Sequence, residues 1–198
     1  MRKRVFSILL SIAVCLSMMP VGAWAETAGE GGTATQSSNV AEVKIGETVT
    51  QYADITEAFA AAQKADSAEV KLLNNAEITT TNTSNVLKGI ELLEGGNITL
   101  DLNGKTLSGK QTSVVSDVSM SILISVYDPC TLTVKDSIGG GAIVQSNSVA
   151  AVRAAGKGKV IIDSGTIENT SSKDETENCA VLVKGSSNVT ISGGIIRG

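Results

Sequence analysis

The sequence of 198 residues contains no histidine and few aromatic residues: one Trp, two Tyr and two Phe. Without histidine the chain lacks the commonest general base and the commonest metal ligand of proteins. The scarcity of aromatic residues leaves few platforms on which nucleic-acid bases could stack, and the formal net charge of −4 gives no excess of positive charge to meet phosphates. We therefore expect no nucleic acid among the partners of this chain.

Residues 1–25 have the pattern of a secretory signal peptide. Three basic residues at positions 2–4 precede an apolar stretch over 5–19, Pro20 ends that stretch, and Ala23-Trp24-Ala25 matches an A-x-A cleavage site. The stretch is too short to span a bilayer comfortably, although an uncleaved anchor helix is the alternative. We expect an extracellular chain, secreted or at the cell surface, that begins at Glu26, keeps 13 basic and 20 acidic residues, and has no transmembrane segment.

A repeated set of aliphatic residues indicates the fold. Four stretches carry them at positions n, n+2, n+8 and n+10, with n at Ile90, Ile124, Val152 and Val181. An n, n+2 pair is typical of a strand with one buried face, and a unit recurring about every 30 residues is typical of a chain that stacks on copies of itself. A weaker copy comprises Val70, Leu72, Ile78 and Thr80, and a third apolar face follows at Val86, Leu107, Ile143, Ile167 and Ile196.

The repeat predicts a mainly β fold: a parallel β-helix of about five turns over residues 70–198. Three short strands per turn enclose a narrow aliphatic core, which explains why aromatic residues are rare. An antiparallel sandwich also has many short strands. It does not account for the constant spacing of six residues between the two strand pairs of each unit, for example from Leu92 to Ile98.

The part before the repeat divides into two segments. Residues 26–40 are rich in Gly, Ser and Thr and predict a flexible linker. Residues 41–69 predict a strand or hairpin over 41–52 that turns at Gly46-Glu47, and then a helix that is capped by Asp54 and ends near Ala65-Asp66. The apolar stripe of this helix suits a lid over the first layer of strands, although the first helix of a small α/β domain is the alternative. The stripe comprises Ile55, Ala58, Phe59 and Ala62.

The runs NITLDLNGKTLSG (97–109) and SNVTISGGIIRG (187–198), with the Ala-rich helix before them, resemble a known family. They are similar to right-handed, pectin-lyase-like β-helix modules of exported Gram-positive surface proteins. The resemblance covers about residues 43–198. It implies a right-handed parallel β-helix with an N-terminal capping helix, and an adhesin-like or carbohydrate-binding module.

The residues between the buried positions form outward columns whose neighbours lie about 4.8 Å apart. Such a polar face could bind sugar hydroxyls, and plain solvated sheet surface is the alternative. Asp101 and Asp163, roughly 9.6 Å apart, are spaced near the limit for an inverting glycosidase, but Lys135 between them would keep both carboxylates ionised. The candidate ligand-binding residues are Asn97, Thr99, Asp101, Thr133, Lys135, Asp163, Asn188 and Thr190.

No catalytic residue, metal ligand or cofactor site is predicted. The acidic residues Asp174, Glu175 and Glu177 lack the alternating pattern of a calcium loop. After signal removal Cys130 and Cys179 remain; in the repeat they lie roughly 9.6 Å apart along the stack and on different faces, so we expect free thiols.

The repeat continues to Gly198, and no segment follows that could cover its last layer of strands. We therefore also expect the chain to be the N-terminal part of a longer protein. The predicted function is an exported, non-catalytic surface module that contacts polysaccharides or host glycans. The alternatives are the N-terminal part of a polysaccharide lyase or glycoside hydrolase, whose active turns would follow residue 198, and a purely structural stalk.

Overall fold

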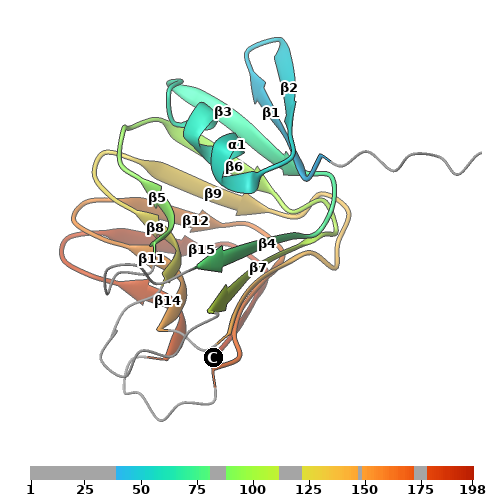
Figure 1. Cartoon of the computed structure of the whole chain (residues 1–198). Coiled ribbons are helices and arrows are strands. Elements are labelled where there is room, and N and C mark those ends of the chain that lie inside the picture. The colour runs from blue at the N-terminus through green and yellow to red at the C-terminus, as the bar shows by residue number, and fades with distance from the viewer. Residues whose placement is uncertain (1–38, 81–87, 112–121, 147–148, 172–177) are drawn as a thin grey trace, which may run out of the picture. The chain divides into compact units, whose positions relative to one another are not determined.

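The computed structural model describes residues 39–80, 88–111, 122–146, 149–171 and 178–198. The chain divides into two units, residues 1–36 and 37–198, and all described residues belong to the second. The predicted signal peptide, residues 26–38 of the predicted linker, Val86 and the acidic residues 174–177 lie outside the described ranges. Within them the chain is mainly β, with sixteen strands and one helix (Figure 1).

The described part begins with a hairpin and a helix. Strands β1 (Ala41–Ile45) and β2 (Thr48–Tyr52) pair antiparallel, and Gly46 in the turn has φ of 60°, so the predicted hairpin is confirmed. Helix α1 (Ile55–Ala62) starts at the predicted cap: the Asp54 carboxylate accepts hydrogen bonds from the backbone N–H groups of Thr56 and Glu57. Its four predicted apolar residues are buried, but the helix ends at Ala62, about one turn earlier than predicted.

The largest sheet, sheet A, has seven strands in the order β15-β12-β9-β6-β3-β1-β2. Its five strands from β3 to β15 are parallel, and β1 continues the sheet by pairing antiparallel with β3. The hairpin therefore covers the edge of the parallel strands. The parallel members are β3 (Ser67–Leu72), β6 (Asn97–Asp101), β9 (Thr131–Lys135), β12 (Lys159–Ile162) and β15 (Asn188–Ile191).

Two smaller sheets are entirely parallel. Sheet B has the order β16-β13-β10-β7-β4, and sheet C the order β14-β11-β8-β5. Sheet B comprises β4 (Ala76–Thr80), β7 (Thr106–Gln111), β10 (Ala142–Ser146), β13 (Thr166–Asn169) and β16 (Ile195–Arg197). Sheet C comprises β5 (Lys88–Leu92), β8 (Ile122–Val126), β11 (Ala150–Ala154) and β14 (Cys179–Val183). Successive strands of the chain thus visit the three sheets in turn, which is compatible with a β-helix-like fold.

The predicted columns align in the sheets. Ile98, Leu132, Val160 and Val189 pair in sequence across sheet A, and the first three have exposed fractions of 0–1%. Burying one such side chain stabilises a fold by about 1.5–3 kcal/mol. In sheet B, Leu107, Ile143, Ile167 and Ile196 pair in the same way.

The predicted alignment of the weaker copy of the repeat with the later copies is wrong. Val70 pairs with Leu100, the n+10 position of the next unit, and not with Ile90 at position n. Strand β3 thus belongs to sheet A, and β4, with Ala76 opposite Leu107, supplies the third face for which Val86 was predicted. In the first turn helix α1 comes directly before β3, at the place that a strand of sheet C occupies in each later turn. The parallel strands begin at Ser67, three residues before the predicted boundary.

The connections between sheets differ in how far their lengths vary. Four residues link each strand of sheet C to the following strand of sheet A, from β5–β6 to β14–β15. The first of these links contains Gly95 and Gly96 with φ of 95° and 99°. The links from sheet B to sheet C range from three residues between β10 and β11 to ten between β7 and β8. The constant link is what the six-residue spacing in the sequence reflects.

Candidate functional site

The outward side of sheet A holds the predicted site residues. Thr99 lies opposite Thr133 in the sheet, and Asp101 lies opposite Lys135. The column of Thr99 and Thr133 continues through Ile161 to Thr190, and a second column runs from Asn97 through Thr131 and Lys159 to Asn188. Asp163 follows β12, where its N–H donates to the carbonyl of Val134. The alternation along the strands thus brings the eight predicted residues to one side of one sheet.

These residues differ in how far they reach solvent. Asn97, Asp163, Asn188 and Thr190 are exposed, and Thr99, Thr133 and Lys135 are half-buried. The Thr190 hydroxyl donates a hydrogen bond of 3.2 Å to the side-chain oxygen of Asn188. Asp101, by contrast, is only 3% exposed. Most of the predicted residues that a ligand can reach therefore carry hydroxyl or amide groups, and the same face also holds the exposed Lys159 and the half-buried Ile161.

The carboxylate of Asp101 is engaged within the protein. Its Oδ1 accepts hydrogen bonds from the backbone N–H groups of Asn103 at 2.9 Å and Ser137 at 3.0 Å, and Lys135 Nζ lies 3.8 Å from its Oδ2. These contacts fasten the corner after β6 to the corner after β9. They leave the carboxylate without the solvent-facing position that a general acid or base needs to reach a sugar.

Lys135 pairs with a residue that the sequence interpretation missed. Its Nζ lies 3.0 Å from Glu69 Oε1, closer than Asp101, and no ion pair joins it to Asp163 among the described residues. The hydrogen bond to Glu69, followed by the negative charges of Glu69 and Asp101, raises the pKa of Lys135 despite partial burial. Glu69 lies opposite Thr99, so an alignment of Val70 with Leu100 in place of Ile90 would have revealed it.

Charges of alternating sign cross the first strands of sheet A. Glu42, Lys71, Asp101 and Lys135 are successive neighbours across β1, β3, β6 and β9. Lys71 Nζ lies 3.8 Å from Glu42 Oε1. The alternating charges therefore run from Lys135 toward the hairpin, and among the described residues no ion pair joins Lys135 to Asp163. Partly exposed pairs of this kind stabilise a fold by about 0–1 kcal/mol each.

A cavity of about 370 Å³ lies where the hairpin meets this face. Lys44 and Glu69 are opposite one another on β1 and β3, and Thr99 comes from the next strand. The cavity thus combines an ammonium, a carboxylate and hydroxyl groups, which together can donate hydrogen bonds to a sugar and accept them from it. Its lining residues are Lys44, Gly46, Ser67, Ala68, Glu69 and Thr99.

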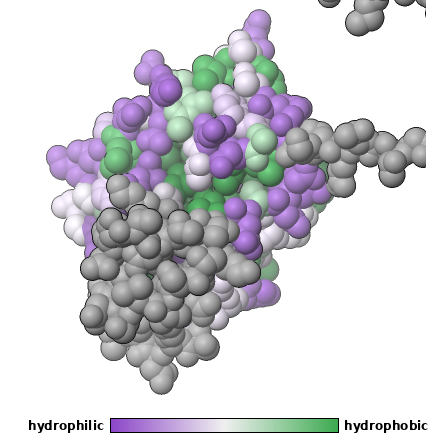
Figure 2. Space-filling view, viewed as in Figure 1, coloured by the Kyte–Doolittle hydropathy of each residue, from purple (hydrophilic) through white to green (hydrophobic). Residues whose placement is uncertain are grey.

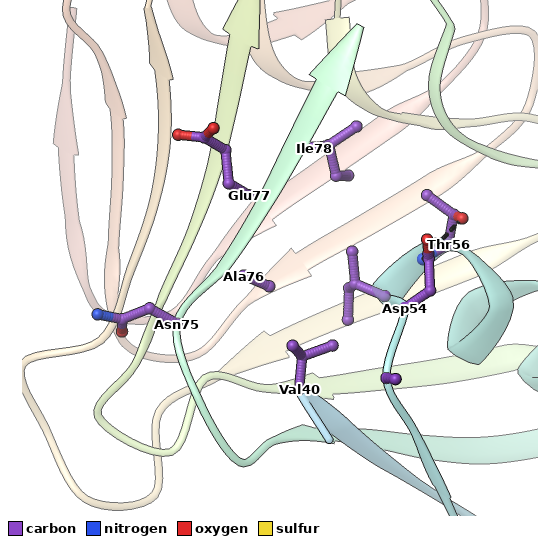
Figure 3. A pocket seen from close by; sticks show the side chains of 9 residues that line it. Val40, Asp54, Thr56, Asn75, Ala76, Glu77 and Ile78 are labelled. Carbon is purple, nitrogen blue, oxygen red and sulfur yellow. Dashed lines mark hydrogen bonds between the residues drawn. The ribbon is translucent and has the colours of Figure 1, made fainter. Parts of the chain in front are cut away.

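A second cavity, of about 330 Å³, lies beside β4 and the start of α1 (Figure 3). Ala76 and Ile78 point from β4 toward the side where Asp54 and Thr56 lie, whereas Asn75 and Glu77 point away. The Asp54 carboxylate on that wall accepts a hydrogen bond from the Thr56 hydroxyl at 2.5 Å and caps the helix. The polar groups of this cavity therefore have a structural role in the helix start.

An arginine and a tyrosine meet beside sheet C. The Arg153 guanidinium lies over the Tyr127 ring, 5.2 Å from its centroid, and Arg153 Nη2 donates to the Tyr127 hydroxyl. Arg153 Nε is buried without a partner among the described residues. Tyr127 lies 26 residues before Arg153, in the preceding turn.

As predicted, no disulfide bond joins Cys130 and Cys179. Cys130 is fully buried, and its Sγ accepts a hydrogen bond from the Gly95 N–H at 3.2 Å. Within the described ranges no group of three Cys, Asp or Glu side chains is placed to hold a metal ion.

No family model matches this chain, and neither the curated proteins nor the solved structures contain a match. The resemblance to pectin-lyase-like modules thus stays a prediction, and the parallel sheets are compatible with a β-helix-like fold. Among the described residues no helix has the length and apolar character needed to cross a membrane. On the face seen in Figure 2, polar and apolar residues alternate over the described surface without one broad apolar patch.

Proposed function

We propose that this chain is an exported, non-catalytic cell-surface module with a right-handed parallel β-helix, and that the outward side of sheet A contacts glycans. The architecture is supported by strands that visit three sheets in turn and by the constant four-residue link from sheet C to sheet A. In this fold α1 and the hairpin close the first turn, because α1 packs against β1 and β3.

The observation that carries the glycan proposal is the pair of polar columns on β6, β9, β12 and β15. Neighbouring residues in each column lie about 4.8 Å apart across the sheet. Hydroxyl and amide side chains occupy three of the four positions in each column, and each hydroxyl can both donate and accept. A polysaccharide presents hydroxyl groups at regular intervals along its length, so a regular array can engage several sugar units at once. The columns comprise Asn97, Thr131, Lys159 and Asn188 in one, and Thr99, Thr133, Ile161 and Thr190 in the other.

The cavity at the hairpin also supports glycan binding on the outward side of sheet A. It opens beside Thr99, at one end of the second column, and adds the Lys44 and Glu69 side chains. A sugar unit in this cavity would meet a donor and an acceptor on opposite strands. The remaining units of the glycan would then follow the threonine column toward Thr190.

The experiment is a glycan array probed with the labelled exported chain, followed by titration of the best polysaccharide. We expect binding, and a loss of at least fivefold in affinity for the double variant Thr133→Val, Thr190→Val. Valine keeps the shape of threonine and suits a strand, so the fold should persist. Thr166→Val in β13 is the matched control, because it makes the same change on sheet B.

Two results would oppose the proposal. Binding that survives the double variant unchanged would place the glycan elsewhere on the molecule. A chain that binds no polysaccharide at any concentration tested would favour the structural stalk.

A further inference from the structure

A positive charge on the outward side of sheet C has no negative partner in the described part of the chain. Arg153 lies between Val152 and Ala154, which belong to the core, so its side chain points away from the core. Arg153 is half-buried, and none of the ion pairs of the described residues includes it. A guanidinium group stays protonated at physiological pH, and a charge that is withdrawn from water is normally balanced by an opposite charge. An anionic partner would therefore stabilise the positive charge of Arg153.

The neighbours of Arg153 in sheet C do not supply that partner. The column that contains it runs from Glu91 through Ser125 and Arg153 to Leu182. Neighbouring residues in a column lie about 4.8 Å apart, so the backbone of Glu91, the acidic member of this column, lies about 9.6 Å from that of Arg153. Asp128 is exposed in the corner after β8, and none of the ion pairs of the described residues joins it to Arg153. No carboxylate of the described residues thus neutralises the guanidinium.

Tyr127 fixes the orientation of this guanidinium. The group lies over the Tyr127 ring, 5.2 Å from its centroid, and Arg153 Nη2 donates to the Tyr127 hydroxyl. The ring contact and the hydrogen bond hold the guanidinium in place before a ligand arrives, which lowers the entropy cost of binding. Because the Tyr127 oxygen accepts a hydrogen bond from Arg153, its own O–H points elsewhere and can donate to a bound group.

Further hydrogen-bond donors lie around the same charge. Tyr127 accepts from Nη2 of Arg153, and Nε is buried without a partner among the described residues. Ser125, which is 3% exposed, places its hydroxyl beside Arg153 on the neighbouring strand β8. The planar fork of an arginine matches the two oxygens of a carboxylate, and hydroxyl groups can donate to the same oxygens. The cluster thus offers donors and a positive charge without a competing negative charge.

We propose that Arg153, Tyr127 and Ser125 form a binding site for the carboxylate group of a small organic anion. The Nη groups of Arg153 bind the carboxylate oxygens, and the hydroxyl groups of Tyr127 and Ser125 donate to them. A neutral sugar is a poorer ligand, because it would leave the charge of Arg153 unbalanced. The site lies on sheet C (Figure 1) and the proposed glycan face on sheet A, so neither proposal depends on the other.

The test uses the side-chain Nε–H signals of arginine in nuclear magnetic resonance spectra of the ¹⁵N-labelled exported chain. After residue 25 the chain has two arginines, Arg153 and Arg197, so the two signals are easily assigned. We expect sodium acetate to shift the Arg153 signal along a saturable curve. Arg197, which is exposed on β16, is the internal control and should show no saturable shift.

Two further compounds separate charge recognition from other effects. Acetamide has the shape of acetate without its charge, and sodium chloride reproduces the ionic strength without a carboxylate. Neither should shift the Arg153 signal along a saturable curve. A shift that either compound reproduces overturns the proposal, and so does the absence of a saturable shift with acetate.

Variants then assign the binding groups. Tyr127→Phe keeps the ring and removes the hydroxyl, so acetate should bind at least threefold more weakly. Arg153→Lys keeps the charge and removes the planar fork, and acetate binding, followed by the backbone amide signals of β8 and β11, should weaken at least tenfold. Tyr52→Phe is the matched control, because it makes the same change on β2 and should leave the affinity unchanged. An affinity for acetate that survives Tyr127→Phe or Arg153→Lys in a folded chain overturns the proposal.

Discussion

Asp136 Oδ1 accepts a hydrogen bond of 2.7 Å from the backbone N–H of Gly104, which lies 32 residues earlier in the preceding turn. The other oxygen, Oδ2, accepts one of 2.7 Å from the Gly141 N–H in its own corner. One carboxylate therefore joins two successive corners between sheets A and B. The Asp136 N–H in turn donates to the Ser164 hydroxyl at 2.7 Å, which extends the connection to a third corner.

Replacing Asp136 with Asn should destabilise the stack. Asn offers one acceptor oxygen in place of two, so its NH₂ group would face a backbone N–H that needs an acceptor. We expect the free energy of unfolding to fall by about 1–2 kcal/mol in urea titrations. Asp163→Asn, at an exposed position, should stay within about 0.5 kcal/mol of the wild type. Equal stability of the two variants would contradict a structural role for Asp136.

The stability of the chain should fall in acid. Burial alone would raise the pKa of Asp136, but the N–H groups of Gly104, Gly141, Gly139 and Ile138 outweigh it and hold the pKa below the ordinary 3.8. A carboxyl group whose pKa is lowered by folding stabilises the fold above its unfolded pKa, and this stabilisation is lost as the pH falls through the folded pKa. Urea unfolding should thus show a decline below about pH 4.

The Asp136→Asn variant tests whether Asp136 causes this loss of stability in acid. Its stability should depend less on pH below pH 4 than that of the wild type, with the two curves converging in strong acid. Asp54, whose pKa is also lowered, chiefly by the Thr56 hydroxyl, accounts for part of the remaining decline. An acid slope that is identical in the variant would assign the effect to other carboxylates.

Gly158 should tolerate no side chain, because two turns approach closely there. A Cβ at this position would lie 2.3 Å from the carbonyl oxygen of Val126, which accepts the Ala155 N–H at 2.9 Å. Gly158→Ala must displace backbone in the preceding turn, and we expect a loss of about 2–3 kcal/mol in thermal or urea unfolding. Lys157→Ala, one residue earlier and exposed, should have almost no effect.

The two thiols should react at different rates in the folded chain. Cys130 is fully buried, and burial is the main cause that raises its pKa, with Asp128 and Glu94 adding to it against the Gly95 N–H. Cys179 is only half-buried. A colorimetric thiol titration should show one fast and one slow thiol, both becoming fast in urea. Cys130→Ser should remove the slow phase; removal of the fast phase would reverse the assignment.

The sequence predicted most of the fold because the core is regular. The aliphatic positions from Ile90 to Ile162 recur at the spacings that the links between strands impose. The same positions are buried in the structure. The first turn was misaligned because α1 replaces its strand in sheet C, so the offsets there match only by coincidence. The interval of 20 residues before Ile90, against 28–34 later, was the available signal.

The candidate site was less predictable than the core. The alternation along each strand gave the correct outward columns, since Thr99, Thr133 and Thr190 do share a face. Which side chains contact one another on that face depends on which turns are neighbours in the stack. Lys135 contacts Glu69, 66 positions away, and this contact follows only from the correct frame of β3.

Variation in length is largest in one of the three links in each turn, because the links from sheet A to sheet B range only from three to six residues. The links from sheet C to sheet A always have four residues, whereas those from sheet B to sheet C range from three to ten. A sequence inserted between β7 and β8 would therefore leave the pairing of all three sheets unchanged. Loops on this side of the molecule can therefore differ in length from turn to turn while the three sheets keep their pairing.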